Sequence, residues 1–405
     1  MGRPEIPRAF PIRAATAVGT AVLAVLPAAP ARADGPAQRQ PPPGMSVVGG
    51  ARLGRAGVQV NPVDGPAAPE LSALAWMVSD LGTGGVLGAK NAHWPLPPAS
   101  TLKTLFADTL LPRQSADTVH RVTAAELAGL GAGSSLVGIQ AGQSYKVSDL
   151  WLGVILRSGN DAVRTLAAMN GGVPAAVAAM QARAAELGAR DTRVVSPDGY
   201  DAPGQVSSAY DLTLFLRSAL ANPDFTRYAG TAVARFPGGL TAKGTAAPAF
   251  QIQNSNRMLA GTEGVARYPG LVAGKSGYTA QAGNTLVTAA ARDGHTLVAT
   301  ILNPQSGKSN AVYNEARQLL DWGFAVRARA EPVGSLVAGP ASAPDGSGTA
   351  GPAEPALAGA LRTAGWATLA ALPFAALLAG AVLTVRRRRR RRHRRARAAG
   401  FTSGG

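Results

Sequence analysis

Short apolar runs separated by turn residues predict strands at both ends of the central part of the chain. Residues 75–79 are mostly apolar, and a glycine-rich stretch separates them from a second short apolar run at 86–87, which is typical of a β-hairpin. Residues 285–291 and 295–302 flank an Arg-Asp-Gly turn and predict a second hairpin. Hairpins join antiparallel neighbours, so the pattern indicates an antiparallel sheet.

Helical periodicity fills the sequence between the two hairpins and returns after the second one. Alanine and leucine recur at spacings of three and four residues at 105–111, 147–156, 161–169 and 173–187. Residues 311–324 have the same periodicity and predict a closing helix. The whole pattern predicts an α+β fold, in which an antiparallel sheet is flanked by helices and carries a helical subdomain.

Two segments beside this unit have a composition that cannot form a packed core. Residues 34–45 are rich in Pro, Gln and Gly, and residues 329–363 consist largely of Gly, Ala, Pro and Ser. We expect the first to be disordered and the second to be a flexible stalk. One globular domain over 46–328 remains.

The N-terminus has the layout of a secretory signal peptide. Three arginines precede an apolar run over 14–29, and Ala31-Arg32-Ala33 supplies a cleavage site of small residues. Cleavage at its end would remove residues 1–33. An uncleaved anchor is the alternative, which Pro27 and Pro30 disfavour because they interrupt the apolar run.

A second apolar segment predicts a membrane anchor near the C-terminus. Residues 364–385 carry no charge, and a helix of that length spans about 33 Å, the thickness of the hydrocarbon core of a bilayer. The basic tail over 386–405 follows directly, and positive charge gathers on the cytoplasmic side. The expected location is therefore the cell membrane, with a single pass and the globular domain outside the cell.

The net charge of +17 is distributed very unevenly. Ten arginines of the tail and a net +3 over residues 1–33 account for most of it, so nucleic acid is not an expected partner. The chain has no cysteine, and an exported domain without disulfides must be stabilised by its core.

The first of three short motifs pairs a serine with a lysine. Ser100 and Lys103 lie three residues apart at the start of an apolar helical run and share one helix face. A neutral lysine amine can take the proton of a serine hydroxyl and so activate it as a nucleophile. The chain holds 34 arginines and six lysines. Arginine cannot lose its proton in a protein, so a lysine at this position has a chemical reason.

The second and third motifs supply polar groups to a cleft. Ser158-Gly159-Asn160 lies between two predicted helices, and a plain interhelix turn is the alternative interpretation. Lys275-Ser276-Gly277 falls in a predicted strand at the edge of the cleft, where Gly277 lets a substrate backbone approach closely. A phosphate-binding loop would need glycine at the position of Pro269, so that interpretation fails.

S-x-x-K, S-x-N and K-[ST]-G, in this order, are similar to the active-site signature of penicillin-binding proteins and serine β-lactamases. Over roughly residues 70–326 the chain resembles the D-alanyl-D-alanine carboxypeptidase family of serine peptidases. The stretches that carry the likeness are 96–100, 147–151, 158–162, 274–283 and 319–324. The resemblance implies the transpeptidase fold of penicillin-binding proteins and removal of the terminal D-alanine from peptidoglycan peptides.

The resemblance also implies roles for the motif residues. Ser100 would form an acyl-enzyme, Lys103 would be its general base, and Ser158 would relay a proton to the leaving amine. The implied substrate-binding residues are Asn160, Lys275, Ser276, Gly277 and Tyr278.

Within the substrate-binding set, the resemblance implies distinct contacts. Asn160 would hold the peptide or order the general base, Lys275 and Ser276 would bind the terminal carboxylate, and the N–H groups of Ser100 and Tyr278 would form an oxyanion hole. Peptidoglycan stem peptides would be the substrates and β-lactam antibiotics the inhibitors. No cofactor is implied, and no metal, since the four histidines lack metal-ligand spacing.

Some positions depart from the family pattern. Residue 276 is serine where the family usually has threonine, which keeps the hydroxyl. The segment from Ser196 to Tyr200 and Gln205 also differ from the usual residues, which leaves the substrate preference open.

Two alternatives compete with the carboxypeptidase. A class A-like β-lactamase needs a deacylating glutamate after the second motif, and neither Glu186 nor Glu263 stands in a matching context. A non-catalytic peptidoglycan-binding protein that retains the fold is the other alternative, which the intact motifs disfavour.

Overall fold

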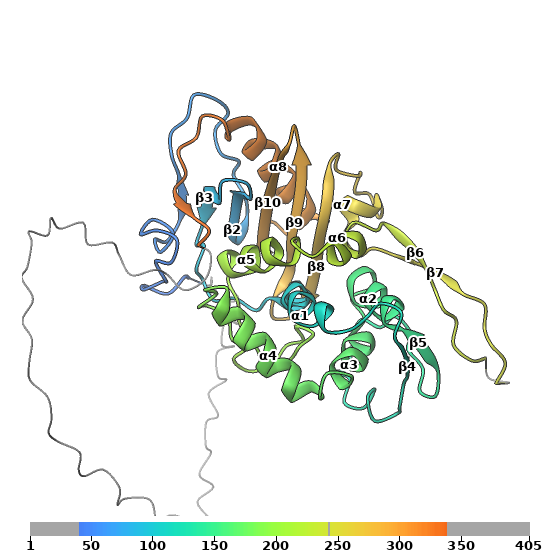
Figure 1. Cartoon of the computed structure of the whole chain (residues 1–405). Helices are drawn as coiled ribbons and strands as arrows, with labels where there is room; N and C mark the ends of the chain where they lie inside the picture. The colour runs from blue at the N-terminus through green and yellow to red at the C-terminus, as the bar shows by residue number, and fades with distance from the viewer. Residues whose placement is uncertain (1–39, 242–243, 338–405) are drawn as a thin grey trace, which may run out of the picture. The chain divides into compact units, whose positions relative to one another are not determined.

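The computed structural model describes residues 40–241 and 244–337 (Figure 1). The predicted signal peptide (1–33), membrane segment (364–385) and basic tail (386–405) lie outside the described residues, as does most of the predicted stalk. Within the described part of the chain, no helix combines the length and the apolar content needed to cross a bilayer.

A seven-stranded antiparallel sheet forms the centre of the domain, with the strand order β1-β3-β2-β10-β9-β8 and with β11 paired to β3. The strands are β1 (Val58–Val60), β2 (Ala73–Asp80), β3 (Gly85–Lys90), β8 (Leu271–Thr279), β9 (Gly283–Arg292), β10 (His295–Pro304) and β11 (Gly334–Ser335). Both predicted hairpins, β2–β3 and β9–β10, are confirmed. Asp293 and Gly294 have positive φ angles of 51° and 75°, which the tight turn between β9 and β10 requires.

The sheet separates two apolar layers, as β2 illustrates. Ala75 and Met77 belong to one buried cluster, whereas Trp76 and Val78 belong to the other, because successive strand residues point to opposite faces. A strand buried on both faces has no polar alternation, so its turns rather than its periodicity mark it in the sequence.

Helices cover both faces of the sheet (Figure 1). The face that carries Trp76 packs against α8 (Ala311–Val326). The other face packs against α1 (Lys103–Leu110) and α5 (Ala209–Ala219), beyond which lies the helical subdomain. The subdomain contains α2 (Val147–Leu156), α3 (Asn160–Ala168) and α4 (Val173–Glu186). The α+β prediction and the five predicted helices are confirmed.

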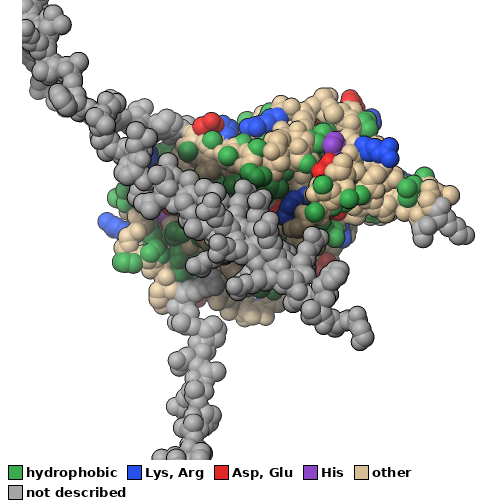
Figure 2. Space-filling model, turned by 90° about the horizontal axis from the view of Figure 1, so that it is seen from below, with side chains coloured by type: hydrophobic (Ala, Val, Ile, Leu, Met, Phe, Trp, Pro, Cys, Tyr) green, Lys and Arg blue, Asp and Glu red, His purple; other side chains and the backbone are tan. Residues whose placement is uncertain are grey.

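Smaller elements complete the domain. The 3-10 turns are η1 (Ala99–Leu102) and η2 (Leu111–Arg113), and two short helices are α6 (Pro223–Ala229) and α7 (Arg257–Ala260). Two ribbons were not predicted: β4 (Val119–Arg121) with β5 (Ser144–Lys146), and β6 (Val233–Phe236) with β7 (Phe250–Gln253). The second ribbon projects from the domain and forms the arm that ends in grey at the right of Figure 2.

The first and last described segments meet at the β3 edge of the sheet. Ser335 N donates to Gly49 O at 2.8 Å, next to the pairing of β11 with β3. The Tyr210 hydroxyl donates to Ser335 O at 2.9 Å and accepts from Val337 N at 3.0 Å. A side chain of α5 thus fastens the segment that leads out of the domain.

Candidate active site

Ser100 lies in η1, in a turn whose backbone is strained. Ala99 has a φ of 50°, a left-handed conformation that costs a non-glycine residue about 1 kcal/mol or more. Thr101 Oγ1 and Thr285 Oγ1 both donate to Pro98 O, at 2.5 and 3.0 Å. These bonds tie the turn to the start of α1 and to β9, so the surrounding structure fixes the position of Ser100.

Lys103 is fully buried, and three polar atoms surround its amine. Lys103 Nζ lies 2.8 Å from Ser100 Oγ, 2.8 Å from Asn160 Oδ1 and 2.6 Å from Asp198 O. A neutral amine has two N–H groups and one lone pair. The two carbonyl oxygens can only accept, so they take both N–H groups and leave the lone pair for the Ser100 hydroxyl.

The environment of Lys103 also favours the neutral amine. Burial lowers the pKa of Lys103 to about 8, although the charges of Asp198 and Asp161 act in the opposite direction. At pH 7 roughly one amine in ten is then neutral, compared with fewer than one in a thousand for an ordinary lysine. The predicted serine and lysine are therefore in contact, and the lysine can act as a base near neutral pH.

The second predicted motif faces the same point from the helical subdomain. Asn160 begins α3, and its Nδ2 donates to Ser134 Oγ at 3.1 Å, which turns its Oδ1 toward Lys103. Ser158 has a φ of 59° and a buried hydroxyl that finds no hydrogen-bond partner among the described residues. Leaving a buried hydroxyl unpaired costs about 1–3 kcal/mol, which a plain turn would not retain.

The third predicted motif lies on β8, the last strand of the main sheet path. Lys275 Nζ donates to Ser276 O at 2.7 Å and to Ser255 Oγ at 3.3 Å, and Ser276 Oγ donates to Ser255 Oγ at 3.1 Å. Burial, together with the charge of Lys103, lowers the pKa of Lys275 well below its usual range. Ser255 was missed by the sequence analysis, since a single serine outside a motif carries no signal.

Two glycines allow backbone segments to lie against the Ser100 turn. A Cβ atom at Gly277 would come within 2.6 Å of Ser100 N, and one at Gly199, whose φ is 80°, within 1.9 Å of Ala99 O. Neither distance is compatible with a side chain. Gly277, near the end of β8 and next to Tyr278, therefore borders Ser100 on one side, and the loop with Gly199 borders it on another.

The loop that contains Gly199 contributes to the site through its backbone. Asp198 O accepts from Lys103, while Asp198 Oδ1 accepts from Ser196 Oγ at 2.8 Å and from Tyr200 N at 2.9 Å. Gln205 Oε1 accepts from Ser196 N at 2.7 Å. The unusual residues at these positions thus hold one another in place and aim a carbonyl at the lysine. Gly199 was the signal in the sequence that could have revealed this close approach.

Ser100 is shared by two cavities. The larger, of about 400 Å³, is also lined by Ser158, Ser276, Arg157, Arg257 and Glu263, and Lys275 is not among its lining residues. The smaller, of about 220 Å³, is also lined by Asn160, Tyr200, Asp201 and Thr279. Tyr278, which is exposed, borders both. Ser276 therefore faces the cleft, and the buried Lys275 amine lies behind it, bonded to Ser276 O and to Ser255 Oγ, whose residue also lines the larger cavity.

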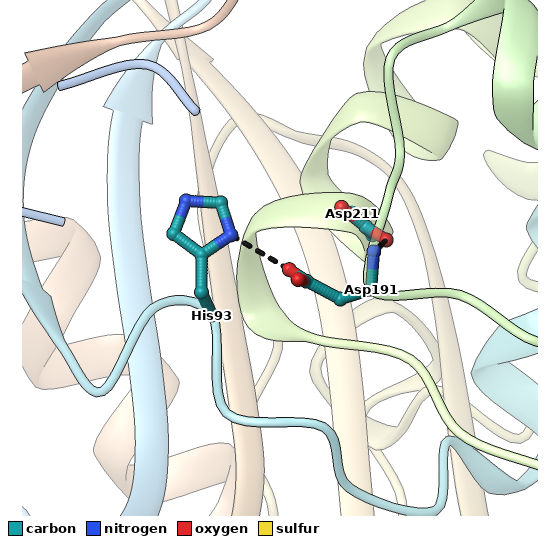
Figure 3. A group of neighbouring side chains, drawn as sticks. All are labelled: His93, Asp191 and Asp211. Carbon is teal, nitrogen blue, oxygen red and sulfur yellow. Dashed lines mark hydrogen bonds and ion pairs between the residues drawn. The ribbon is translucent and has the colours of Figure 1, made fainter. Parts of the chain in front are cut away.

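The structure also groups His93 with Asp191 and Asp211, which the spacing of the histidines did not suggest (Figure 3). His93 Nδ1 lies 2.6 Å from Asp191 Oδ2, and Nε2 lies 2.9 Å from Val48 O. The ring is thus held between the Asp191 carboxylate and the Val48 carbonyl. Burial and the charge of Asp191 raise the pKa of Asp211 well above its usual range. None of the three side chains lines either cavity beside Ser100.

Solved structures resemble this domain closely. A D-alanyl-D-alanine carboxypeptidase from Mycobacterium tuberculosis matches with a TM-score of 0.61 and 37% identity, over 69% of this chain and 100% of that chain. A Streptomyces DD-transpeptidase matches with a TM-score of 0.59 and 26% identity, over 64% of this chain and 99% of that chain. These similarities confirm the predicted transpeptidase fold.

Sequence comparisons point to the same group of proteins. D-alanyl-D-alanine carboxypeptidase DacB2 of Mycobacterium tuberculosis is 37% identical over 285 residues, which are 69% of this chain and 92% of that protein. DacD of Salmonella typhimurium, which carries the same enzyme name, is 33% identical over 64% of this chain and 64% of its own length. A family model described as D-alanyl-D-alanine carboxypeptidase matches residues 63–306. With its three motifs assembled around Ser100, this chain belongs to the D-alanyl-D-alanine carboxypeptidase family of serine peptidases.

Proposed function

We propose that the protein is a serine-type D-alanyl-D-alanine carboxypeptidase, which removes the terminal D-alanine from peptidoglycan stem peptides through an acyl-enzyme on Ser100. One observation carries this proposal: the buried Lys103 amine lies 2.8 Å from Ser100 Oγ, with acceptors for both of its N–H groups. Serine-type acyl transfer needs such a base within hydrogen-bond reach of the nucleophile.

The first half of the reaction transfers the peptide to the serine. Ser100 Oγ attacks the carbonyl between the two D-alanines while its proton passes to Lys103 Nζ. The N–H groups of Ser100 and Tyr278 stabilise the resulting oxyanion. The unpaired hydroxyl of Ser158 relays the proton from Lys103 to the leaving amine, and free D-alanine departs. Water then hydrolyses the ester in a second step, with Lys103 again accepting a proton.

The contacts of the terminal carboxylate are assigned differently from the expectation. Lys275 is buried and donates to Ser276 O, so we propose that Ser276 and Arg257 bind the carboxylate and that Lys275 holds Ser276 in position. Arg257 lines the larger cavity and is about one-third exposed, which suits a guanidinium that receives a carboxylate. The role of Lys275 is then to position its neighbours rather than to bind substrate directly.

The two competing interpretations receive less support. Glu186 is an exposed residue of α4 that pairs with Arg183, and Glu263 pairs with Arg257, so neither is set up as the base that deacylation of a β-lactamase requires. A non-catalytic relative would have no reason to retain a buried lysine with a lowered pKa and a strained Ser158 with an unpaired hydroxyl beside Ser100.

Release of D-alanine tests the proposed function. Purified protein incubated with an uncross-linked muropeptide pentapeptide should yield the tetrapeptide and one equivalent of D-alanine, measured by mass spectrometry. Prior treatment with penicillin should block the release, because it occupies the same serine. A protein that is labelled by penicillin but leaves the pentapeptide intact would contradict the carboxypeptidase and support a binding role.

We further propose that the protein is anchored in the cell membrane by residues 364–385, with its domain outside the cell. The proposal is supported by the uncharged stretch and by the arginines that follow it. Full-length protein should sediment with membranes and resist extraction by high salt, whereas a chain ending at residue 360 should be released in soluble form. Recovery of the full-length chain in the soluble fraction would contradict the anchor.

A further inference from the structure

The cleft on the two sides of Ser100 carries opposite charge. The larger cavity is lined by Arg157, Arg257 and Glu263; Arg257 and Glu263 form an ion pair, whereas Arg157 has no ion-pair partner within the described residues, so the lining is net positive. The smaller cavity has a single charged lining side chain, that of Asp201. A substrate that crosses Ser100 therefore meets positive charge at one end of the cleft and negative charge at the other.

This polarity fixes the direction in which the peptide lies. The proposed function places the terminal carboxylate in the larger cavity, beside Ser276 and Arg257. The acyl part of the peptide, which stays on Ser100 after D-alanine leaves, must then extend toward the smaller cavity. The residue that precedes the two D-alanines is the first whose side chain can reach Asp201.

Asp201 is held in place but keeps the capacity to bind a ligand. Its Oδ1 accepts from Thr279 Oγ1 at 2.7 Å, and its Oδ2 accepts from Gln281 N at 3.2 Å. Each carboxylate oxygen has two lone pairs, so both oxygens can accept another hydrogen bond. The side chain is partly exposed, and it forms no ion pair with any cation in the described part of the chain.

Aromatic walls complete the cavity around this carboxylate. Tyr200 precedes Asp201, and its hydroxyl donates to Ala132 O at 2.8 Å, so it spans from the loop to the helical subdomain. Its ring packs so tightly there that a Cβ atom at Gly131 would lie 2.4 Å from it. Tyr278 stands exposed at the mouth. Two tyrosine rings beside one carboxylate suit an aliphatic chain that ends in an ammonium group.

We propose that the smaller cavity is a subsite for a primary ammonium group, carried by the side chain of the residue before the two D-alanines and bound by Asp201. The inference rests on the proposed function, because it takes the orientation of the peptide from it. It makes Asp201 a specificity-determining residue for substrates with a free side-chain amine, and it predicts that neutralising that amine weakens their use.

Two tripeptides that differ only in this amine test the subsite. Nα-acetyl-L-Lys-D-Ala-D-Ala has a free ε-amine, and Nα,Nε-diacetyl-L-Lys-D-Ala-D-Ala does not. The wild-type protein should have a kcat/KM about tenfold higher for the first peptide than for the second, mostly because its KM is lower. A solvated charge pair typically strengthens binding by about tenfold. In Asp201→Asn the kcat/KM for the free-amine peptide should fall to that for the diacetyl peptide, so that the preference disappears. Asp293→Asn, a surface change in the β9–β10 turn, should keep the preference.

The outcomes separate the subsite from the reaction itself. If Asp201→Asn lowers kcat/KM equally for both peptides, Asp201 only stabilises the position of β8 and the subsite does not exist. If the wild-type protein has the same kcat/KM for both peptides, the subsite does not exist either, and no variant is needed to show it. Salt screens a charge pair, and the Debye length shortens about threefold between 0.05 and 0.5 M NaCl. The wild-type preference for the free-amine peptide should therefore shrink over this range. If neither peptide releases D-alanine, the proposed function fails, and the subsite inference fails with it.

Discussion

Replacing Lys103 by arginine should abolish detectable acylation of Ser100 while the domain stays folded. Arginine keeps the positive charge and cannot give it up, so no lone pair is available to the serine hydroxyl. Loss of a general base typically lowers a rate by about 10²–10⁴-fold. The measurement is the second-order rate constant for labelling by a fluorescent penicillin, with circular dichroism and thermal melting as checks of folding.

Matched variants separate the chemistry from the size of the side chain. Arginine is larger than lysine in a fully buried position, so Lys103→Met, which is neutral and close in length, should be equally inactive. Lys146→Arg should behave as wild type, because Lys146 is a surface residue paired with Asp117 at 3.2 Å. Acylation of Lys103→Met at the wild-type rate would show that another group serves as the base.

The same assignment sets the sign of the pH dependence. The reactive form has a neutral Lys103, whose pKa is about 8, so the acylation rate should rise about tenfold from pH 7 to pH 9 and level off above that. Activity is lost as the pH falls through 8, because the amine becomes protonated. A flat profile over this range would be inconsistent with Lys103 as the base.

Ser100→Ala should remove covalent labelling by penicillin entirely and lower D-alanine release by on the order of 10⁴-fold or more. No other oxygen is placed beside the Lys103 amine as a nucleophile, since its two further contacts are carbonyl oxygens. The fold should persist, because alanine fits the η1 turn. Ser309→Ala, an exposed serine before α8, is the control and should label fully. Stoichiometric labelling of Ser100→Ala would refute the nucleophile.

Local patterns predicted most elements of the fold, and the exceptions have a physical cause. The hairpins and α2 carry turn residues or helical periodicity, which are local properties. Helix α5 was missed; its residues from Ala209 to Leu216, polar ones included, are buried by contacts with other elements, which the local sequence does not show. The β4–β5 and β6–β7 ribbons are only three or four residues long, which is too short for alternation to be recognised.

The candidate site shows the same division between local and long-range information. Ser100 and Lys103 could be paired from sequence, because one helical turn brings them together. The carbonyl of Asp198 could not be found in this way, since a backbone oxygen has no residue type and reaches Lys103 across 95 positions. The hydrogen bonds of the Lys275 amine to Ser276 O and Ser255 Oγ could not be predicted for a similar reason. Strand alternation says which residues share a face but not how a long side chain bends between its neighbours.

The meeting of the two chain ends at β3 has a mechanical consequence. β11 and the Tyr210 contacts lie at one edge of the sheet, and β8, which carries Lys275 and Gly277, lies at the other. Four strands separate β11 from β8, so the two edges are about 24 Å apart at the usual spacing between strands. Tension arriving through the C-terminal segment would first load the short β11 pairing and the Tyr210 hydroxyl. Under the proposed membrane anchor, the catalytic edge would stay unstrained while the domain is pulled.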